Sequence, residues 1–258
     1  MKVRALASGS GGNAVWFEAG GASYLVDCGI SHQDLSRRAN ACGISLDSLS
    51  GIFFTHDHED HYRGLATFHK RHPQIPFYAN GETADAIARL TKVEEGWCTF
   101  ENAVPFQIGN LIVTPFSIPH DAVDPVGYLF DDGENPFFLG TDMGMALLPM
   151  KQALARAVIA VLESNYDPVL LAASQRPLSV KQRIAGRSGH LSNADSAQAL
   201  REAAPKRLKV LMLAHISQEC NGPWRAVEAA EAALKDLKRT GVRVAALAQD
   251  TPGELYEC

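Results

Sequence analysis

The seven residues Thr55-His56-Asp57-His58-Glu59-Asp60-His61 directly follow the apolar run Gly51-Ile52-Phe53-Phe54. Four of the seven carry side chains that can bind a metal ion: His56, His58, Asp60 and His61. The apolar run predicts a buried strand over 51–55, and α/β proteins place their ligands in loops beyond the carboxyl ends of such strands. A solvated polar loop is the alternative, but four potential ligands in six residues behind a buried strand favour a metal site.

Three more potential ligands stand at the ends of other predicted strands. They are His120 after 111–118, Asp142 after 136–140, and His215 at the end of 210–215. Each one alone is equally compatible with a capping or hydrogen-bonded side chain, whereas three at equivalent strand ends favour one shared site. Imidazole and carboxylate ligands suit Zn²⁺, Mn²⁺ or Fe²⁺, and six to seven of them are enough for two metal ions.

The remaining pattern predicts a mixed α/β fold. Further apolar runs predict strands over 23–28, 127–130, 158–163 and 242–247. Apolar residues at helical spacing predict helices over 31–42, 81–90, 147–157, 192–203 and 223–239. The fourth helix opens with a capping box from Ser192 to Asp195. An early β-meander followed by alternating strands and helices predicts one α/β domain over residues 1–258.

Composition excludes several classes of protein. The 258 residues have the ordinary composition of a globular protein, which excludes collagen, coiled coils and disordered chains. No apolar run approaches the ~18–20 residues that cross a bilayer, and the N-terminus lacks the apolar core of a signal peptide, so we expect a cytoplasmic protein with no membrane partner. The five cysteines are scattered without a C-x-x-C pair, which argues against disulfides and structural zinc. Cys28, at the end of an apolar strand, is expected to be a small core residue.

Asp27, the histidine motif, His120, Asp142 and His215 together resemble the metallo-β-lactamase superfamily, and they occur in that family's order. The resemblance implies a four-layered αβ/βα sandwich with two metal ions at one edge. It implies His56, His58 and His120 on one metal, and Asp60, His61 and His215 on the other. Asp142 would bridge both metals, and Asp27 would hold the histidine loop from behind; a buried Asp27 that caps the loop without any link to metal is the alternative.

A narrower resemblance is to the YycJ/WalJ group of that superfamily. It rests on five segments: Ala7–Ala14, Leu25–Gly29, Glu163–Asn165, Gly189–Asn193 and Leu213–Ser217. The group implies a metal-dependent 5′-to-3′ DNA exonuclease linked to mismatch repair. The ligand types favour Zn²⁺ or Mn²⁺, and Mg²⁺ or Fe²⁺ are also compatible. A hydroxide shared by the metals would attack the phosphodiester, with Asp60 and Asp142 as catalytic ligands. The sequence departs from the group at Tyr166, where histidine is usual.

Other polar residues are candidates for contacting a substrate. His190 precedes a predicted helix and would contact the scissile phosphate or protonate the leaving oxygen, although a hydrogen bond to backbone is an alternative. Ser192 and Asn193 lie at the same helix start, where N–H groups favour a phosphate, or where they act as plain N-caps. The segment 8–13 lacks a Walker A ending and predicts a tight turn that brings Asn13 toward the site. His32, His69 and His72, away from strand ends, are expected on the surface.

The formal net charge of −5 conceals an uneven distribution. Residues 176–209 contain eight basic and two acidic residues, a net charge of +6, so the rest of the chain carries −11. This basic segment includes Arg183 and Arg187 and brackets His190, as expected for binding the backbone of a polyanion. A solvated helix face is the alternative reading of the same charges.

The leading hypothesis is therefore a dinuclear metal-dependent phosphodiesterase that acts on nucleic acid, with DNA favoured over RNA. One alternative is hydrolysis of a small phosphodiester, ester or thioester at the same metals. A second is a catalytically impaired DNA-repair binding protein, which the Tyr166 departure keeps open. The sequence gives no preference for an oligomeric state.

Overall fold

Two seven-stranded sheets organise the chain. The computed structural model describes all residues from Met1 to Cys258. The first sheet has the strand order β14-β1-β2-β3-β4-β5-β6 and the second β13-β12-β11-β10-β9-β8-β7. The strands of the first sheet are β1 (Lys2–Ala7), β2 (Ala14–Ala19), β3 (Ala22–Val26), β4 (Leu49–Phe53), β5 (Phe77–Asn80), β6 (Trp97–Phe100) and β14 (Tyr256–Glu257). Those of the second are β7 (Phe106–Ile108), β8 (Leu111–Ser117), β9 (Val126–Asp131), β10 (Phe137–Gly140), β11 (Ile159–Glu163), β12 (Val210–Ala214) and β13 (Arg243–Ala246).

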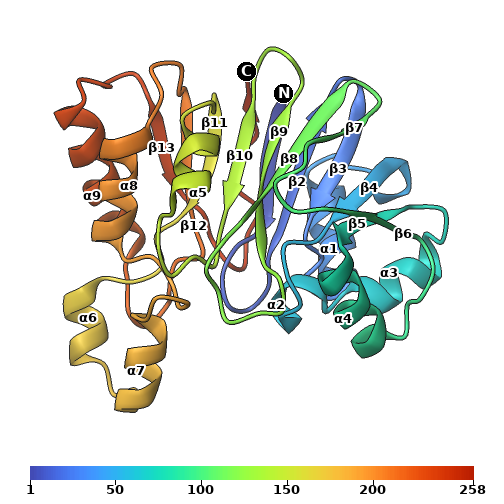
Figure 1. The fold of residues 1–258 in the computed structure, drawn as a ribbon, viewed down its shortest axis with the longest axis horizontal. Helices are drawn as coiled ribbons and strands as arrows, with labels where there is room; N and C mark the ends of the chain where they lie inside the picture. Colours follow the sequence, from blue (N-terminus) through green and yellow to red (C-terminus); the bar gives the residue numbers. More distant parts are fainter. The chain divides into compact units, whose positions relative to one another are not determined.

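Helices and one short 3₁₀ turn connect these strands (Figure 1). The helices are α1 (His32–Ala41), α2 (Glu59–Tyr62), α3 (Leu65–Arg71), α4 (Gly81–Thr91), α5 (Leu148–Leu154), α6 (Pro168–Ala173), α7 (Leu178–Ile184), α8 (Asn193–Ala203) and α9 (Pro223–Asp236), and the turn is η1 (Leu46–Ser48). The start of α8 carries the predicted capping box, in which Ser192 and Asp195 bond each other's backbone N–H. No helix is both long and apolar enough to span a membrane.

By its internal contacts the chain divides into two compact units. The first unit comprises Met1–Pro115, Ala122–Val126 and Ala248–Glu257, and the second comprises Phe116–Asp121, Gly127–Leu247 and Cys258. Each unit thus collects segments that are far apart in the sequence. The single domain predicted over 1–258 stays a prediction.

In the first unit, the parallel strands β3 to β6 deliver their carboxyl ends to the same edge of the sheet. Strand β4 is buried on both faces, which explains its uninterrupted apolar sequence. Ile52 and Phe54 pack into the core beneath α1, α3 and α4, while Phe53 stacks on Tyr78 on the opposite face. Full burial of each Phe side chain contributes roughly 1.5–3 kcal/mol, so the loop that follows starts from a rigid support.

In the second unit, β10 to β13 are parallel and β9 runs antiparallel to β10. Helices α5, α8 and α9 cover this sheet, with α8 packed on α9 and α9 on β13. Their buried residues, such as Leu154, Leu200 and Leu234, form one apolar core with the strands. The short helices α6 and α7, yellow to orange in Figure 1, extend away from this core. The loops after β10, β11 and β12 therefore emerge at one edge of the sheet.

The structure confirms the predicted strands and helices, with ends that shift by a few residues. The hydrophobic pattern gave no ranges for β1 and β2 of the early meander. It also did not predict several elements that are short or lie at sheet edges: β5, β6, β7, β14, α2, α3, α6 and α7. One surface expectation is wrong. His72 is 7% exposed, because it follows α3 and its ring packs against Phe68.

Gly29 allows the closest backbone approach in the first unit. A Cβ atom at this position would lie 1.6 Å from the carbonyl oxygen of Asp60. We therefore expect Gly29→Ala to lower the free energy of unfolding by about 1–3 kcal/mol or more, measured by urea denaturation. Gly81→Ala is the matched control, because a Cβ there meets no atom within 4 Å. Equal stability of the two variants would contradict the close approach.

Candidate metal centre

In the first unit, the segment Thr55–His61, here called the histidine loop, is held at the end of β4 by Asp27. Asp27 follows the neighbouring parallel strand β3, and its carboxylate accepts hydrogen bonds from the backbone N–H of Thr55 at 2.9 Å and from the Thr55 hydroxyl at 3.0 Å. The same carboxylate accepts a 2.8 Å hydrogen bond from Nδ1 of His61. Burial raises the pKa of Asp27, and the donors on His61 and Thr55 oppose that rise.

These contacts fix the protonation of two histidine rings in the loop. Nδ1 of His61 donates to Asp27, so its lone pair is on Nε2. Nδ1 of His56 lies 3.0 Å from the Thr55 hydroxyl, whose proton is directed to Asp27, so His56 likewise presents its lone pair on Nε2. A carboxylate behind a metal-binding imidazole is the usual arrangement for orienting such a ligand.

The four predicted ligands of this loop lie together. The rings of His56 and His61 have centroids 4.0 Å apart, and those of His56 and His58 4.7 Å. Asp60 Oδ2 lies 3.6 Å from Nε2 of His61. Two ligands that share one tetrahedral Zn²⁺ at 2.0–2.2 Å lie about 3.4 Å apart, so the spacing of this pair fits a shared metal ion.

Asn13 lies against this loop instead of open solvent. It is 5% exposed, and its side-chain amide nitrogen lies 3.3 Å from Oδ2 of Asp60 and 3.1 Å from Nε2 of His61. Its backbone N–H donates to the Asp60 carbonyl. The glycine turn before it is closed by the Gln249 side chain, which accepts from the Gly11 N–H at 2.8 Å. Asn13 therefore contacts two predicted ligands, while its contact with substrate stays a prediction.

In the second unit, five side chains meet at the strand ends; we call them the strand-end cluster. They are His120 after β8, Asp142 after β10, Glu163 at the end of β11, His190 before α8 and His215 after β12. Ligand atoms of Asp142, Glu163, His190 and His215 all lie within 4.8 Å of one another. Asp142 is at the centre, with Oδ1 3.4 Å from Nε2 of His215, 3.5 Å from Nδ1 of His190 and 4.0 Å from Nε2 of His120.

The chemistry of these donors fits a cation. Nδ1 of His120 donates to the carbonyl of Gly189 at 3.1 Å, so in the neutral ring the lone pair is on Nε2. That nitrogen faces carboxylate oxygens of Asp121 at 3.4 Å and Asp142 at 4.0 Å. A lone pair that faces carboxylates is stabilised by a positive charge between them. Buried imidazoles and carboxylates at these separations are therefore suited to a divalent metal ion.

Glu163 belongs to the strand-end cluster, although the sequence did not single it out as a site residue. It is fully buried and accepts hydrogen bonds from Nδ1 of His190 at 2.7 Å and from the backbone N–H groups of Met143 at 2.7 Å and Leu191 at 3.2 Å. It thereby joins the loop of Asp142 to His190. Its position at the end of a buried parallel strand is the signal that could have identified it.

Three residues of the candidate centre share an uncommon backbone conformation. Asp27, Asp142 and His215 have φ values of 61°, 58° and 53°, in the left-handed region that residues other than glycine seldom adopt. Asp27 and His215 directly follow strands β3 and β12, and Asp142 is the second residue after β10. Such strain persists where the surroundings determine it, and it concentrates at functional sites. This observation supports a functional centre at these strand ends.

The side chains of Ser192 and Asn193, predicted to contact substrate, form hydrogen bonds within the second unit. The Ser192 hydroxyl accepts from the Asp195 N–H and donates to its carboxylate. Asn193 is 5% exposed; its carbonyl oxygen accepts from the Ser164 hydroxyl at 2.7 Å, and its amide contacts Asn221. These side chains brace the start of α8 beside His190. Their binding to substrate stays a prediction.

The basic segment is partly neutralised. Arg183 bonds Asp121 at 2.6 Å, Arg176 pairs with Glu219 and Arg201 with Asp236, and all three carboxylates lie outside residues 176–209. Lys151, also from outside, pairs with Glu202. Three carboxylates and one lysine from outside the segment are thus paired with it, and counting them lowers the net charge of the basic segment from +6 to +4. Arg187 is exposed and makes no ion pair, so it is the more available of the two predicted arginines.

Tyr166 occupies an apolar position. It is 6% exposed and packs with Leu171 and Cys220, and burial raises the pKa of its phenol. Its carbonyl accepts from the Asn193 N–H, which ties the loop after β11 to the start of α8. The departure from histidine at this position is therefore accommodated in the core and leaves the strand-end cluster complete.

Cys28 behaves as the sequence predicts. It is fully buried between the histidine loop and α3, and burial raises the pKa of its thiol to about 12. We expect iodoacetamide at pH 8 to modify the exposed Cys98 in the folded protein and to leave Cys28 unmodified, as measured by peptide mass spectrometry. Both should react once guanidinium unfolds the chain. Equal rates in the folded protein would contradict this burial.

Comparison with known proteins agrees with these features. A family model for the β-lactamase superfamily domain matches residues 23–216. Exodeoxyribonuclease YycJ of Bacillus anthracis is 32% identical over 222 residues, which cover 84% of this chain and 82% of that protein. Exodeoxyribonuclease WalJ of Streptococcus pneumoniae is 32% identical over 225 residues, 86% of this chain and 83% of that protein.

Among solved structures, the metallo-β-lactamase fold protein YhfI of Bacillus subtilis matches with a TM-score of 0.75 at 18% identity, over 99% of both chains. This likeness shows the fold, and it confirms the predicted mixed α/β class. The fold family implies divalent metal ions, in agreement with the donor chemistry of both clusters. The chain thus belongs to the metallo-β-lactamase superfamily of metal-dependent hydrolases and, within it, to the YycJ/WalJ group.

Proposed function

We propose that this protein is a dinuclear metal-dependent nuclease, foremost a 5′-to-3′ DNA exonuclease with a role in mismatch repair. The observation that carries the proposal is the strand-end cluster, with Asp142 Oδ1 between His190 and His215, in a chain 32% identical to two exodeoxyribonucleases. We further propose that residues 1–258 act as one hydrolase domain. The repeated passage of the chain between the two compact units supports this.

The proposed ligand set is the one that the family resemblance implies. His56, His58 and His120 would hold one divalent ion, Asp60, His61 and His215 the second, and Asp142 both. Zn²⁺ and Mn²⁺ suit these donors best, and Mg²⁺ and Fe²⁺ are compatible. When bound, the two ions would activate a water molecule as nucleophile and neutralise the charge that develops on the phosphoryl group.

The residues of the chain would orient that chemistry. Asp27 and Thr55 fix the rings of the histidine loop, and Glu163 fixes His190. With Nδ1 bonded to Glu163, His190 presents Nε2, and its side chain is 19% exposed. We propose that His190, when it carries a proton on both ring nitrogens, contacts the scissile phosphate or gives its Nε2 proton to the leaving oxygen. The tautomer follows from the Glu163 contact, because a carboxylate accepts only from the protonated nitrogen.

The test uses end-labelled single- and double-stranded DNA and RNA with Mn²⁺, Mg²⁺ or Zn²⁺. We expect stepwise release of nucleotides from the 5′ end of DNA, and loss of that release in Asp60→Ala. Metal analysis of the purified protein should give about two equivalents. Hydrolysis of small chromogenic esters or phosphodiesters alone would contradict a nuclease. DNA binding without any hydrolysis, by protein that holds its metals, would favour the impaired binding protein.

Salt dependence tests the basic segment. We expect Arg183→Glu combined with Arg187→Glu to weaken DNA binding and to reduce the slope of log K against log salt by about 1–2, measured by fluorescence anisotropy. Because Arg183 is already paired with Asp121, most of the change should come from Arg187. Arg239→Glu, outside the segment, is the control. An unchanged slope would mean that the segment is a solvated face.

A further inference from the structure

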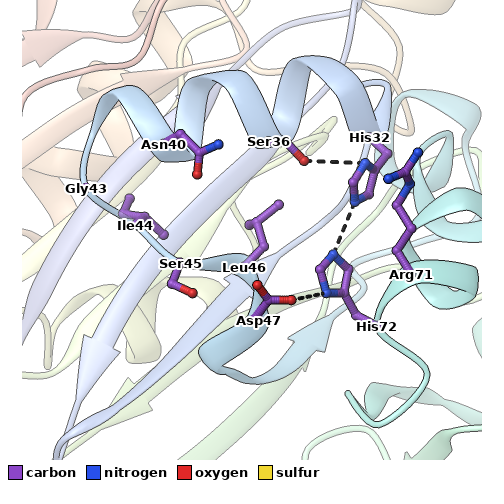
Figure 2. A pocket seen from close by; sticks show the side chains of 10 residues that line it. All are labelled: His32, Ser36, Asn40, Gly43, Ile44, Ser45, Leu46, Asp47, Arg71 and His72. Carbon is purple, nitrogen blue, oxygen red and sulfur yellow. Dashed lines mark hydrogen bonds and ion pairs between the residues drawn. The ribbon is translucent and has the colours of Figure 1, made fainter.

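A second polar pocket lies in the first unit and contains none of the proposed metal ligands. It has a volume of about 580 Å³ and lies between α1, η1 and the end of α3 (Figure 2). Polar side chains line most of it: His32, Ser36, Asn40, Ser45, Arg71 and His72. We call it the imidazole pocket. The proposed nuclease assigns it no role.

Two histidine rings face each other in this pocket. Nε2 of His32 lies 3.2 Å from Nε2 of His72, while the ring centroids are 5.4 Å apart and the planes differ by 25°. The nitrogens therefore point at each other nearly head-on, as in an N–H···N hydrogen bond. Two ligands of one metal would instead converge on a third point. The pair is thus built to share a proton.

The contacts at the outer nitrogens extend this arrangement. The Ser36 hydroxyl lies 3.3 Å from Nδ1 of His32, and Oδ1 of Asp47 lies 3.0 Å from Nδ1 of His72, at ion-pair distance (Figure 2). With both rings neutral, Ser36 donates to His32, His32 donates to His72, and His72 turns its N–H toward Asp47. An added proton goes to Nδ1 of His32, which then donates to the Ser36 hydroxyl, while the proton between the two Nε2 atoms stays shared by the pair.

The pocket lining holds one guanidinium, that of Arg71, and one carboxylate, that of Asp47, which do not pair with each other. Arg71 lies beside His32 and makes no ion pair (Figure 2). Burial, Arg71 and His72 together lower the pKa of His32, which shows that a positive charge on that ring is opposed. Asp47 is the one carboxylate in the lining; its side chain is 84% exposed and is directed at His72. The Arg71 guanidinium is therefore open to an anion in this concave site.

We propose that the imidazole pocket binds a tetrahedral oxyanion of the phosphate class. The Arg71 guanidinium would hold two of its oxygens, since this group matches such anions with two parallel hydrogen bonds. Hydroxyl and amide donors of Ser36, Asn40 and Ser45 line the same space. The His32–His72 pair would take up one proton on binding, because the anion offsets the repulsion from Arg71.

This coupling makes binding depend on pH. The charged and titratable groups that face His32 are His72 and Arg71 at the end of α3 and Asp47 in η1. Since the free pocket opposes protonation of His32, a bound anion lets His32 take up a proton at a higher pH than in the free pocket. The affinity for a dianion of fixed charge should therefore rise as the pH falls from 8 to 6.

The experiment measures sulfate binding by the full chain, because sulfate stays a dianion over this range. Calorimetry at pH 6.0 and 8.0, in two buffers of different ionisation enthalpy, should give tighter binding at pH 6.0 with uptake of about one proton. The ring resonances of His32 and His72 should shift on titration. A 5′-phosphorylated dinucleotide is the second probe: equal affinity supports a site for the oxyanion alone, and preference for the dinucleotide supports a site for phosphate carried on nucleic acid.

Three variants make the result specific to the pocket. Arg71→Ala should weaken sulfate binding about tenfold, whereas Lys70→Ala, the neighbouring cation that is not in the lining, should leave it unchanged. His32→Gln should bind sulfate with no pH dependence. Equal weakening by the Arg71 and Lys70 variants, silent His32 and His72 resonances, or no proton uptake would overturn the proposal. None of the three variants changes a proposed metal ligand, so a failed nuclease assay would not bear on this result.

Discussion

Replacing Asp142 by alanine is expected to reduce hydrolysis by roughly 10³-fold or more and to lower the bound metal from about two equivalents to one or fewer. Asp142 is 2% exposed, and its Oδ1 approaches three imidazoles of the strand-end cluster at 3.4 to 4.0 Å. Removing this carboxylate takes away the ligand proposed for both metals and leaves the imidazoles without their central anion. Metal analysis and steady-state kinetics on end-labelled DNA check the two effects separately.

Asp131→Asn is the matched control for this substitution. Asp131 also ends a strand of the second sheet, but it bonds Arg156 at 2.8 Å and takes no part in the strand-end cluster. The control should keep its metal and its activity, and circular dichroism should show that both variants fold. A folded Asp142→Ala protein with two metals and full activity would refute the proposed centre, whatever its substrate.

The histidine loop could be predicted because its information is local. His56, His58, Asp60 and His61 lie within six residues, and the buried strand before them has an uninterrupted apolar sequence. The other ligands were predictable from their places at strand ends, because parallel strands bring their carboxyl ends to one edge of a sheet. Fold class followed from the same strand and helix periodicity.

What could not be predicted depends on contacts between residues far apart in the sequence. From the sequence, Glu163 is predicted only as the last residue of a strand. The fold shows that its carboxylate accepts a hydrogen bond from His190, 27 residues later. His32 and His72 are 40 residues apart, and no motif in the sequence links them, so the contact between their rings was not predicted. The basic segment was overestimated for the same reason, since the carboxylate that pairs with Arg183 lies 62 residues away.

Glu163→Gln is expected to lower the rate of hydrolysis by about 10–100-fold and the free energy of unfolding by about 1–3 kcal/mol. Gln has the same shape as Glu, but it replaces one acceptor by a donor. One oxygen of the Glu163 carboxylate accepts from Nδ1 of His190 and the other from the N–H groups of Met143 and Leu191, so the new amide nitrogen must face either His190 or both backbone donors. His190 or the Asp142 loop then loses its support.

The two possible displacements have different signatures. If His190 loses its partner, its ring is free to change tautomer, and the low-field resonance of its Nδ1 proton should disappear while the bound metal stays near two equivalents. If the Asp142 loop moves, metal affinity should fall as well. Glu202→Gln, on the surface of α8 and paired with Lys151, should change neither property. Unaltered kinetics and an unaltered His190 resonance in Glu163→Gln would show that this buried carboxylate does not position the centre, because no other acidic side chain contacts Nδ1 of His190 within 3 Å.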